Sequence, residues 1–258
     1  MSLLKYNKNS VNTITPKVSF RINPTDMSDS SNEERDISVD NIFDINRLGL
    51  EDLEQGKSLT LGVDYKKESL QDINKFFELK FAGVLRDVNQ KNIPLKSSIN
   101  QKTSNLFGST TYNLSKNVNL DYNFSIDNDL KSFEKNIIGL NLSFLEDING
   151  VPKFNTNFSF TESNGKMGDS NVLSNSTTYN FKEDNYISFQ TRRNRKINFT
   201  EYYDLVYQYK NDCLVAGIKF KKTYYQDRDL KPQEDLLFTI TFFPITQFEQ
   251  RIDQTIWK

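Results

Sequence analysis

The sequence predicts an all-β protein, an antiparallel transmembrane β-barrel of which about twelve strands can be recognised. Three observations favour this fold class: apolar and polar residues alternate in runs of about ten, short and long connections take turns, and aromatic residues make up 13% of the chain. Alternation with a period of two is typical of a strand with one apolar and one polar face. A barrel strand crosses a membrane with only about 9–11 such residues.

Residues 201–246 show the alternation most clearly, in three consecutive runs. A tight polar turn at 210–212 separates the first two runs, and a longer charged loop at 224–234 separates the second from the third. The apolar positions of the three runs are Tyr203, Leu205, Tyr207 and Tyr209; Leu214, Ala216, Ile218 and Phe220; and Leu236, Phe238, Ile240 and Phe242. We therefore expect three antiparallel strands, the last of which is Asp235–Ile245.

The same pattern continues through the rest of the chain, and residues 1–8 resemble the end of an earlier strand. The remaining expected strands are 13–24, 57–67, 76–86, 105–114, 118–127, 136–146, 153–162, 173–181 and 186–193. In the run 118–127 the residues expected to face lipid are Val118, Leu120, Tyr122 and Phe124, with Asn119, Asp121, Asn123 and Ser125 opposite. Glycines inside the strands, such as Gly62 and Gly108, indicate bends or close packing.

Most of the connections divide into two sets, with a brief link at Arg195 and a turn of intermediate length near Ser69 as exceptions. Short polar turns are expected at 115–117, 147–150, 182–184 and 210–212, and longer loops at 25–56, 87–104, 163–171 and 224–234. Short turns at one rim and long loops at the other are typical of outer-membrane barrels, whose long loops face the outside. Within the longest loop, the segment Asn41–Leu50 is more apolar than a solvated loop requires.

Composition excludes several functions. The 258 residues carry a net charge of -1, which gives no basic footprint for nucleic acid. The chain has no histidine, and its one cysteine excludes an internal disulfide and a multi-cysteine metal site. No arrangement of residues suggests catalysis, so we expect neither an enzyme nor a cofactor.

Two alternatives remain open at this stage. No run reaches the roughly 18 apolar residues of a transmembrane helix, and the N-terminus lacks the apolar core of a signal peptide. Alternation of period two also fits a soluble β-sandwich. Two alternatives to a part of a larger barrel therefore remain: a self-contained twelve-stranded outer-membrane pore, and a soluble β-rich binding protein.

Particular residues suggest a family. The segments TPKVSFRINP, DNIFDINRLGLEDLEQGKSLTLGVDY, FFELKFAGVLRD, LFGSTTYNLSKNVNLDYNFSID and YQYKNDCLVAGIKFKKTYYQDRD together resemble the C-terminal barrel of the lipopolysaccharide-assembly protein LptD. The most specific parts are Asn41–Tyr65 and the Asn-Asp-Cys turn that ends at Cys213. The resemblance implies that residues 1–258 form one partial barrel domain, without the family's periplasmic domain and first strands.

The resemblance also implies a function and partners. Such a barrel lies in the outer membrane, is plugged by an LptE-like lipoprotein, receives lipopolysaccharide from a periplasmic LptA-like bridge and releases it sideways through a seam. The seam strand would contain Leu236, Phe238, Ile240, Phe242 and Pro244. Cys213 stands where the family pattern places a cysteine that forms a disulfide with the periplasmic domain. The resemblance therefore implies an intermolecular disulfide at Cys213. The alternative is that Cys213 has no such role and is simply a small residue at the end of a strand.

Overall fold

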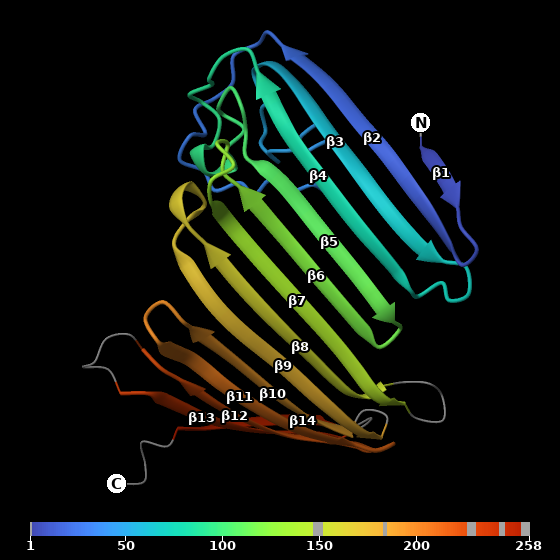
Figure 1. Ribbon diagram of the computed structural model, residues 1–258. Helices are drawn as coiled ribbons and strands as arrows, with labels where there is room; N and C mark the ends of the chain where they lie inside the picture. Colours follow the sequence, from blue (N-terminus) through green and yellow to red (C-terminus); the bar gives the residue numbers. More distant parts are fainter. Residues whose placement is uncertain (1, 147–151, 183–184, 226–230, 243–245, 254–258) are drawn as a thin grey trace. The chain divides into compact units, whose positions relative to one another are not determined.

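The structure is a computed structural model that describes the chain except for residues 1, 147–151, 183–184, 226–230, 243–245 and 254–258 (Figure 1). It confirms the all-β, antiparallel part of the prediction. Its strands form one meander sheet, in which each strand is hydrogen-bonded to its neighbours in sequence from β1 to β14. Two single-turn 3₁₀ helices, η1 (Leu95–Ser97) and η2 (Gly165–Met167), lie in connections.

The strand bounds follow the alternation in the sequence. The strands are β1 (Leu3–Tyr6), β2 (Ser10–Asn23), β3 (Gly56–Ser69), β4 (Phe76–Arg86), β5 (Leu106–Ser115), β6 (Val118–Ile126), β7 (Phe133–Glu146), β8 (Pro152–Ser163), β9 (Ser170–Lys182), β10 (Asn185–Asn194), β11 (Phe199–Lys210), β12 (Leu214–Thr223), β13 (Gln233–Phe242) and β14 (Thr246–Asp253). The expected strands correspond to β2 through β13. Of the expected turns, 147–150 and part of 182–184 lie outside the described residues.

The expectation that Asp235–Ile245 is the last strand is wrong. The residues Leu236, Phe238, Ile240 and Phe242 lie on β13, which pairs with β12 on one side and with β14 on the other. Pro244 lies outside the described residues. Because β13 has partners on both sides, it is not the edge at which a seam would open.

The sheet is not closed into a barrel by hydrogen bonds among the described residues. At one end of the sheet, β1 pairs only with Val11–Ile14 of β2. The rest of β2, residues 15–23, is therefore paired along one side only in the part of the chain that the structure covers. An unpaired strand edge exposes a row of backbone donors and acceptors, which folded proteins usually shorten, cover or pair.

Most of the longer connections lie at one end of the strands and most of the short turns at the other, as the sequence predicts, although the connection 195–198 is shorter than the turn 70–75 at the opposite end. The long connections 24–55 and 87–105 and the connections 127–132, 164–169, 195–198 and 224–232 join one set of strand ends. The connections at the other ends include the turns 7–9, 70–75, 116–117 and 211–213. We call the first set of strand ends the loop rim and the second set the turn rim.

The chain divides into two compact units, the first of residues 1–138 and 161–170 and the second of residues 139–160 and 171–258. In the first unit, residues in register across neighbouring strands share a face of the sheet. Val18, Leu61 and Gly83 form one such row, and Phe20, Leu59 and Leu85 form the next. We call this the outer face.

The opposite face of the same strands, the inner face, lies under the two long loops (Figure 1). Near the loop rim it carries Arg21, Ser58, Thr60 and Arg86 beside the apolar residues Ala82 and Val84. The buried apolar core of the described residues lies between these loops and the sheet. It consists of Met27, Ile37, Val39, Ile42, Leu48, Leu50, Ala82, Val84, Ile93, Ile99 and Phe107. The apolar character of Asn41–Leu50 in the sequence is thereby explained, because this segment covers the inner face.

Candidate functional site

The outer face of the first unit is apolar and open. Its exposed side chains are Ile14, Val18, Phe20, Ile22, Leu61, Val63, Leu85 and Tyr112, each between 37% and 69% exposed. Scattered exposed apolar residues are ordinary, but a contiguous apolar surface indicates contact with lipid or with another protein. The cross-strand register makes this surface contiguous over β2, β3 and β4.

The residues expected to face lipid lie on this same outer face. Leu120 pairs with Tyr112, Tyr122 with Thr110, and Phe124 with Gly108, and Val118 follows an irregularity in register at Ser115. All four are half-buried. Their contact with lipid therefore stays a prediction.

Aromatic rings partly cover one another on the outer face. The Phe124 ring lies 5.9 Å from that of Phe81, 5.9 Å from that of Phe133 and 5.2 Å from that of Tyr122, between ring centroids. A Cβ at Gly108 would lie only 2.2 Å from Phe124 Cζ. Glycine at 108 therefore lets the Phe124 ring pack closely against β5, in agreement with the close packing that the sequence indicates.

An apolar groove of about 490 Å³ opens where β4 separates from β5. Strand pairing between β4 and β5 ends at Ala82, and beyond it the segment 102–104 runs alongside β4, with a bridge between Leu85 and Thr103. Exposed Leu61, Val63 and Leu130 line the groove. The groove thus belongs to the apolar surface and carries no polar group suited to chemistry.

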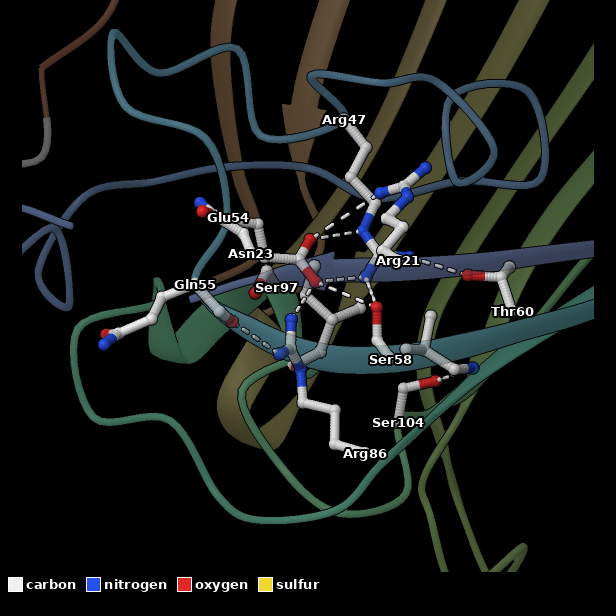
Figure 2. A network of polar contacts seen from close by, with 12 residues as sticks. Arg21, Asn23, Arg47, Glu54, Gln55, Ser58, Thr60, Arg86, Ser97 and Ser104 are labelled. Atoms are coloured by element: carbon white, nitrogen blue, oxygen red, sulfur yellow. Dashed lines mark hydrogen bonds and ion pairs between the residues drawn. The ribbon is translucent and has the colours of Figure 1, made fainter. Parts of the chain in front are cut away.

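The inner face holds a buried ion network that joins the longest loop to three strands (Figure 2). Arg47 of the loop donates to Glu54 through Nε at 2.6 Å and through Nη2 at 2.5 Å. Its Nη1 donates to Thr60 Oγ1 at 3.0 Å, on β3. The Arg47 side chain is completely buried and that of Glu54 is 6% exposed, so this pair is protected from water.

Two further arginines complete the network. Arg86, at the end of β4, donates through Nη2 to Glu54 and through Nε to the Ile99 carbonyl of the second long loop, at 2.5 Å. Arg21 of β2 places Nη1 3.7 Å from Glu54 Oε2 and donates through Nη2 to the Asp44 carbonyl at 2.5 Å. One carboxylate therefore ties together β2, β4 and both loops.

The electrostatics of the network favour an ionised Glu54. Burial alone would raise the pKa of Glu54, but the hydrogen bonds from Arg47 and the charges of Arg47, Arg86 and Arg21 outweigh it and lower the pKa below its ordinary value. A buried charge is tolerable only when it is paired in this way. The network can hold loops in place, but it has no nucleophile, base or open position for chemistry.

The loop also packs directly on the inner face. A Cβ on Gly62 of β3 would lie 2.8 Å from Phe43 Cζ, so glycine lets the Phe43 ring approach the strand. Lys17 lies over the same ring at 5.6 Å and pairs with Asp64 at 2.5 Å. Charged side chains and an aromatic ring thus line the surface below the loop.

A second polar cluster lies beneath the loop 87–105. Asn105 donates from Nδ2 to Ser125 Oγ at 3.0 Å and to Glu134 Oε2 at 2.6 Å. All three residues are buried. Burying hydrogen-bonded polar groups in this way fixes the loop without a purely apolar core.

The second unit repeats the open apolar face. Tyr203, Leu205, Tyr207 and Tyr209 of β11 are each between 38% and 43% exposed. Ile218 of β12 and Ile240 of β13 share that face. The alternate position Asp204 is buried and pairs with Lys219 at 3.0 Å.

Cys213 precedes β12 at the turn rim as an exposed free thiol. Its backbone N–H donates to Asn211 Oδ1 at 3.0 Å, as expected of a tight polar turn. The described residues contain no group of acidic, histidine and cysteine side chains able to hold a metal ion. They also include no helix long and apolar enough to cross a membrane.

The network of Arg21, Arg47, Glu54 and Arg86 was not predicted from the sequence. In the sequence these residues look like ordinary solvated charges, and only the apolar residues around Arg47 distinguish that part of the loop. Comparison with known proteins adds nothing to this picture: neither the protein-family models nor the curated proteins contain a match for the chain.

Proposed function

We propose that this chain forms part of the wall of an outer-membrane β-barrel that takes part in lipopolysaccharide transport to the cell surface. The observation that carries the membrane location is the reversed polarity of the sheet in the first unit. Exposed Val18, Phe20 and Ile22 stand on the open face, whereas Arg21 and Ser58 lie under the loops. In water this arrangement would expose apolar surface needlessly, but in a bilayer it matches each face to its solvent.

Strand length and loop position support the same location. β2 and β3 have 14 residues each and β5 has 10, against the roughly 9–11 that cross a bilayer. With the long loops outside, the turn rim faces the periplasm. In a membrane the unpaired edge of β2 must be paired with another strand, from the same chain or from a second copy, because lipid cannot satisfy backbone groups. The chain is therefore proposed to form the wall of a closed barrel.

The lipopolysaccharide cargo is proposed on the resemblance to the LptD barrel. The most specific part of that resemblance, Asn41–Tyr65, includes the segment that covers the inner face and the residues Arg47 and Glu54. An LptE-like lipoprotein, a periplasmic LptA-like bridge and outer-membrane lipid are the partners that this proposal implies. Cys213, exposed at the turn rim, is available for the disulfide to a periplasmic partner.

Surface labelling tests the membrane location and its topology. In a Cys213→Ser background, Lys91→Cys should react with an impermeant maleimide on intact cells, and Lys116→Cys only after the outer membrane is opened. Both lysines are exposed, and they lie at opposite rims. Equal labelling of both sites in intact cells would contradict the topology.

A depletion experiment tests the cargo separately. Loss of the protein should lower surface lipopolysaccharide and raise the amount retained in the inner membrane. If depletion leaves the amount of surface lipopolysaccharide unchanged, although the cysteine labelling pattern is as expected, the lipopolysaccharide cargo is wrong. The protein would then be an outer-membrane pore with another cargo.

A further inference from the structure

A second pocket lies at the turn rim of the first unit, away from the covered inner face. It has a volume of about 700 Å³ and lies beside the turns 7–9 and 70–75. These turns are joined by a hydrogen bond of 3.0 Å from the Leu70 N–H to the Asn9 carbonyl. This hydrogen bond holds together the two turns that border the pocket. It is lined by Asn9, Ser10, Lys67, Ser69, Gln71, Lys75, Phe76, Phe77 and Tyr112.

The charged side chains that line this pocket are all positive. Lys67 and Lys75 line it, and no aspartate or glutamate does. Neither lysine has an ion-pair or hydrogen-bond partner for its ammonium group among the described residues. By contrast, Lys66 on the same strand pairs with Glu68 at 2.8 Å, and Lys80 on β4 pairs with Glu78 at 3.2 Å. The two free ammonium groups attract an anion.

The aromatic wall of the pocket gives it an apolar side. Phe77 lies opposite Lys67 in the register of β3 and β4 and opposite Tyr112 in that of β4 and β5. Its ring packs edge-on against Tyr112 at 6.1 Å and lies 6.3 Å from Tyr65. Aromatic side chains at the end of an apolar strand face are typical of the level of lipid headgroups. The anion should therefore belong to a molecule that also has hydrocarbon.

Neighbouring exposed residues agree with that class of ligand. Leu70 is 57% exposed and Ile73 is 88% exposed in the turn that carries Lys75. Ser69 Oγ accepts the N–H groups of Gln71 and Asp72, which leaves its own hydroxyl hydrogen to donate. A phosphate with a glycerol body and acyl chains would meet ammonium groups, a hydroxyl and apolar side chains together.

We propose that this pocket binds the phosphate headgroup of an anionic glycerophospholipid in the membrane leaflet at the turn rim. The inference rests on the proposed membrane location but not on the lipopolysaccharide cargo. A lysine near a negatively charged membrane surface contributes about a fivefold preference for anionic lipid. Removing both lysines should therefore abolish most of the selectivity.

The test uses the full chain folded into vesicles of equimolar phosphatidylglycerol and phosphatidylcholine. After extraction in mild detergent, native mass spectrometry measures the two lipids that remain bound. We expect wild type to retain phosphatidylglycerol preferentially and Lys67→Gln with Lys75→Gln to lose the preference. Arginine at both positions should preserve it.

Lys57→Gln is the matched control. Lys57 is exposed on β3 and lies at the loop rim, outside the pocket. The control should retain phosphatidylglycerol as wild type does, and an equal loss in this variant would overturn the site. Displacement of bound phosphatidylglycerol by inorganic phosphate at matched ionic strength would also overturn it, in favour of a site for free phosphate.

Two other outcomes separate this inference from the proposed function. If the protein enters vesicles but binds both lipids equally, the headgroup site is wrong and the membrane location stands. If the protein enters neither these vesicles nor vesicles of phosphatidylcholine alone, the membrane location fails and the site fails with it.

Discussion

Arg47 and Glu54 form a two-point ion pair within a single loop, at 2.6 Å and 2.5 Å, and the pair is closed off from solvent. Both residues lie between β2 and β3, yet Glu54 also accepts from Arg86 at the end of β4. The pair therefore fixes the shape of the loop and attaches it to the sheet in one step (Figure 2).

Glu54→Gln should release the long loop from the inner face. Three arginines would then share a buried site without a carboxylate, and removing one partner of a buried pair costs about 3–5 kcal/mol. The free energy of unfolding, measured in urea on protein folded in vesicles, should fall by that amount, and trypsin should cleave after Arg35 more rapidly. Glu51→Gln, at an exposed position in the same loop, is the control and should change neither quantity.

The attachment of the loop should depend on pH in the acidic range. Because the pKa of Glu54 lies below its ordinary value of 4.5, its ionisation stabilises the folded state above that value. The contribution is lost as the pH falls through the lowered pKa of the folded protein. The difference in unfolding free energy between wild type and Glu54→Gln should therefore be constant near neutral pH and shrink below pH 4.5. A constant difference throughout the acidic range would contradict this assignment.

Val18→Arg should impair membrane assembly. Val18 is 69% exposed, so in water an arginine there would be harmless, whereas a charge on the lipid face of a barrel costs about 2–4 kcal/mol near mid-membrane. The folded fraction in vesicles, measured by heat-modifiable migration in electrophoresis, should fall.

Ile45→Arg provides the comparison for that substitution. Ile45 is 84% exposed but lies in the long loop and not on a strand. This variant should assemble normally. Equal tolerance of both arginines would favour a soluble β-rich protein.

Gly62→Ala should disturb the inner face more than Gly83→Ala. A Cβ at residue 62 would lie 2.8 Å from Phe43 Cζ and 2.9 Å from the Phe81 carbonyl oxygen, whereas at residue 83 the nearest atom is 3.7 Å away. Overpacking of this kind costs about 1–3 kcal/mol. Urea unfolding should show the loss for Gly62→Ala, with Gly83→Ala within a few tenths of wild type.

The strands could be predicted from the sequence because alternation is a local property. In the run 118–126 every second residue is apolar, and the structure places these residues on one face. β14 was missed because only Phe248 and Ile252 interrupt its polar residues. β1 lies within residues 1–8, where the sequence does indicate a strand end. Closure of the sheet could not be read from alternation at all.

The buried network could not be predicted because it depends on distant pairing. Arg86 and Glu54 are 32 residues apart, and nothing in either segment identifies the other. The apolar residues of Asn41–Leu50 did indicate that the loop is covered. They could not show which charges lie beneath it, because an arginine has the same sequence signature in water and in a buried pair.

The meander topology sets an order of folding. Each strand pairs with its neighbour in sequence, so most of the sheet can grow one hairpin at a time with little loop-closure entropy. The pairs β2–β3 and β4–β5 are the exceptions, because each must close one of the two long loops. Glu54 can meet both Arg21 and Arg86 only after β2, β3 and β4 have joined. The loop 24–55 can therefore dock on the sheet only late in folding, after these three strands have paired in the correct register. If one of the strands paired out of register, Arg21 and Arg86 could not both reach the carboxylate of Glu54.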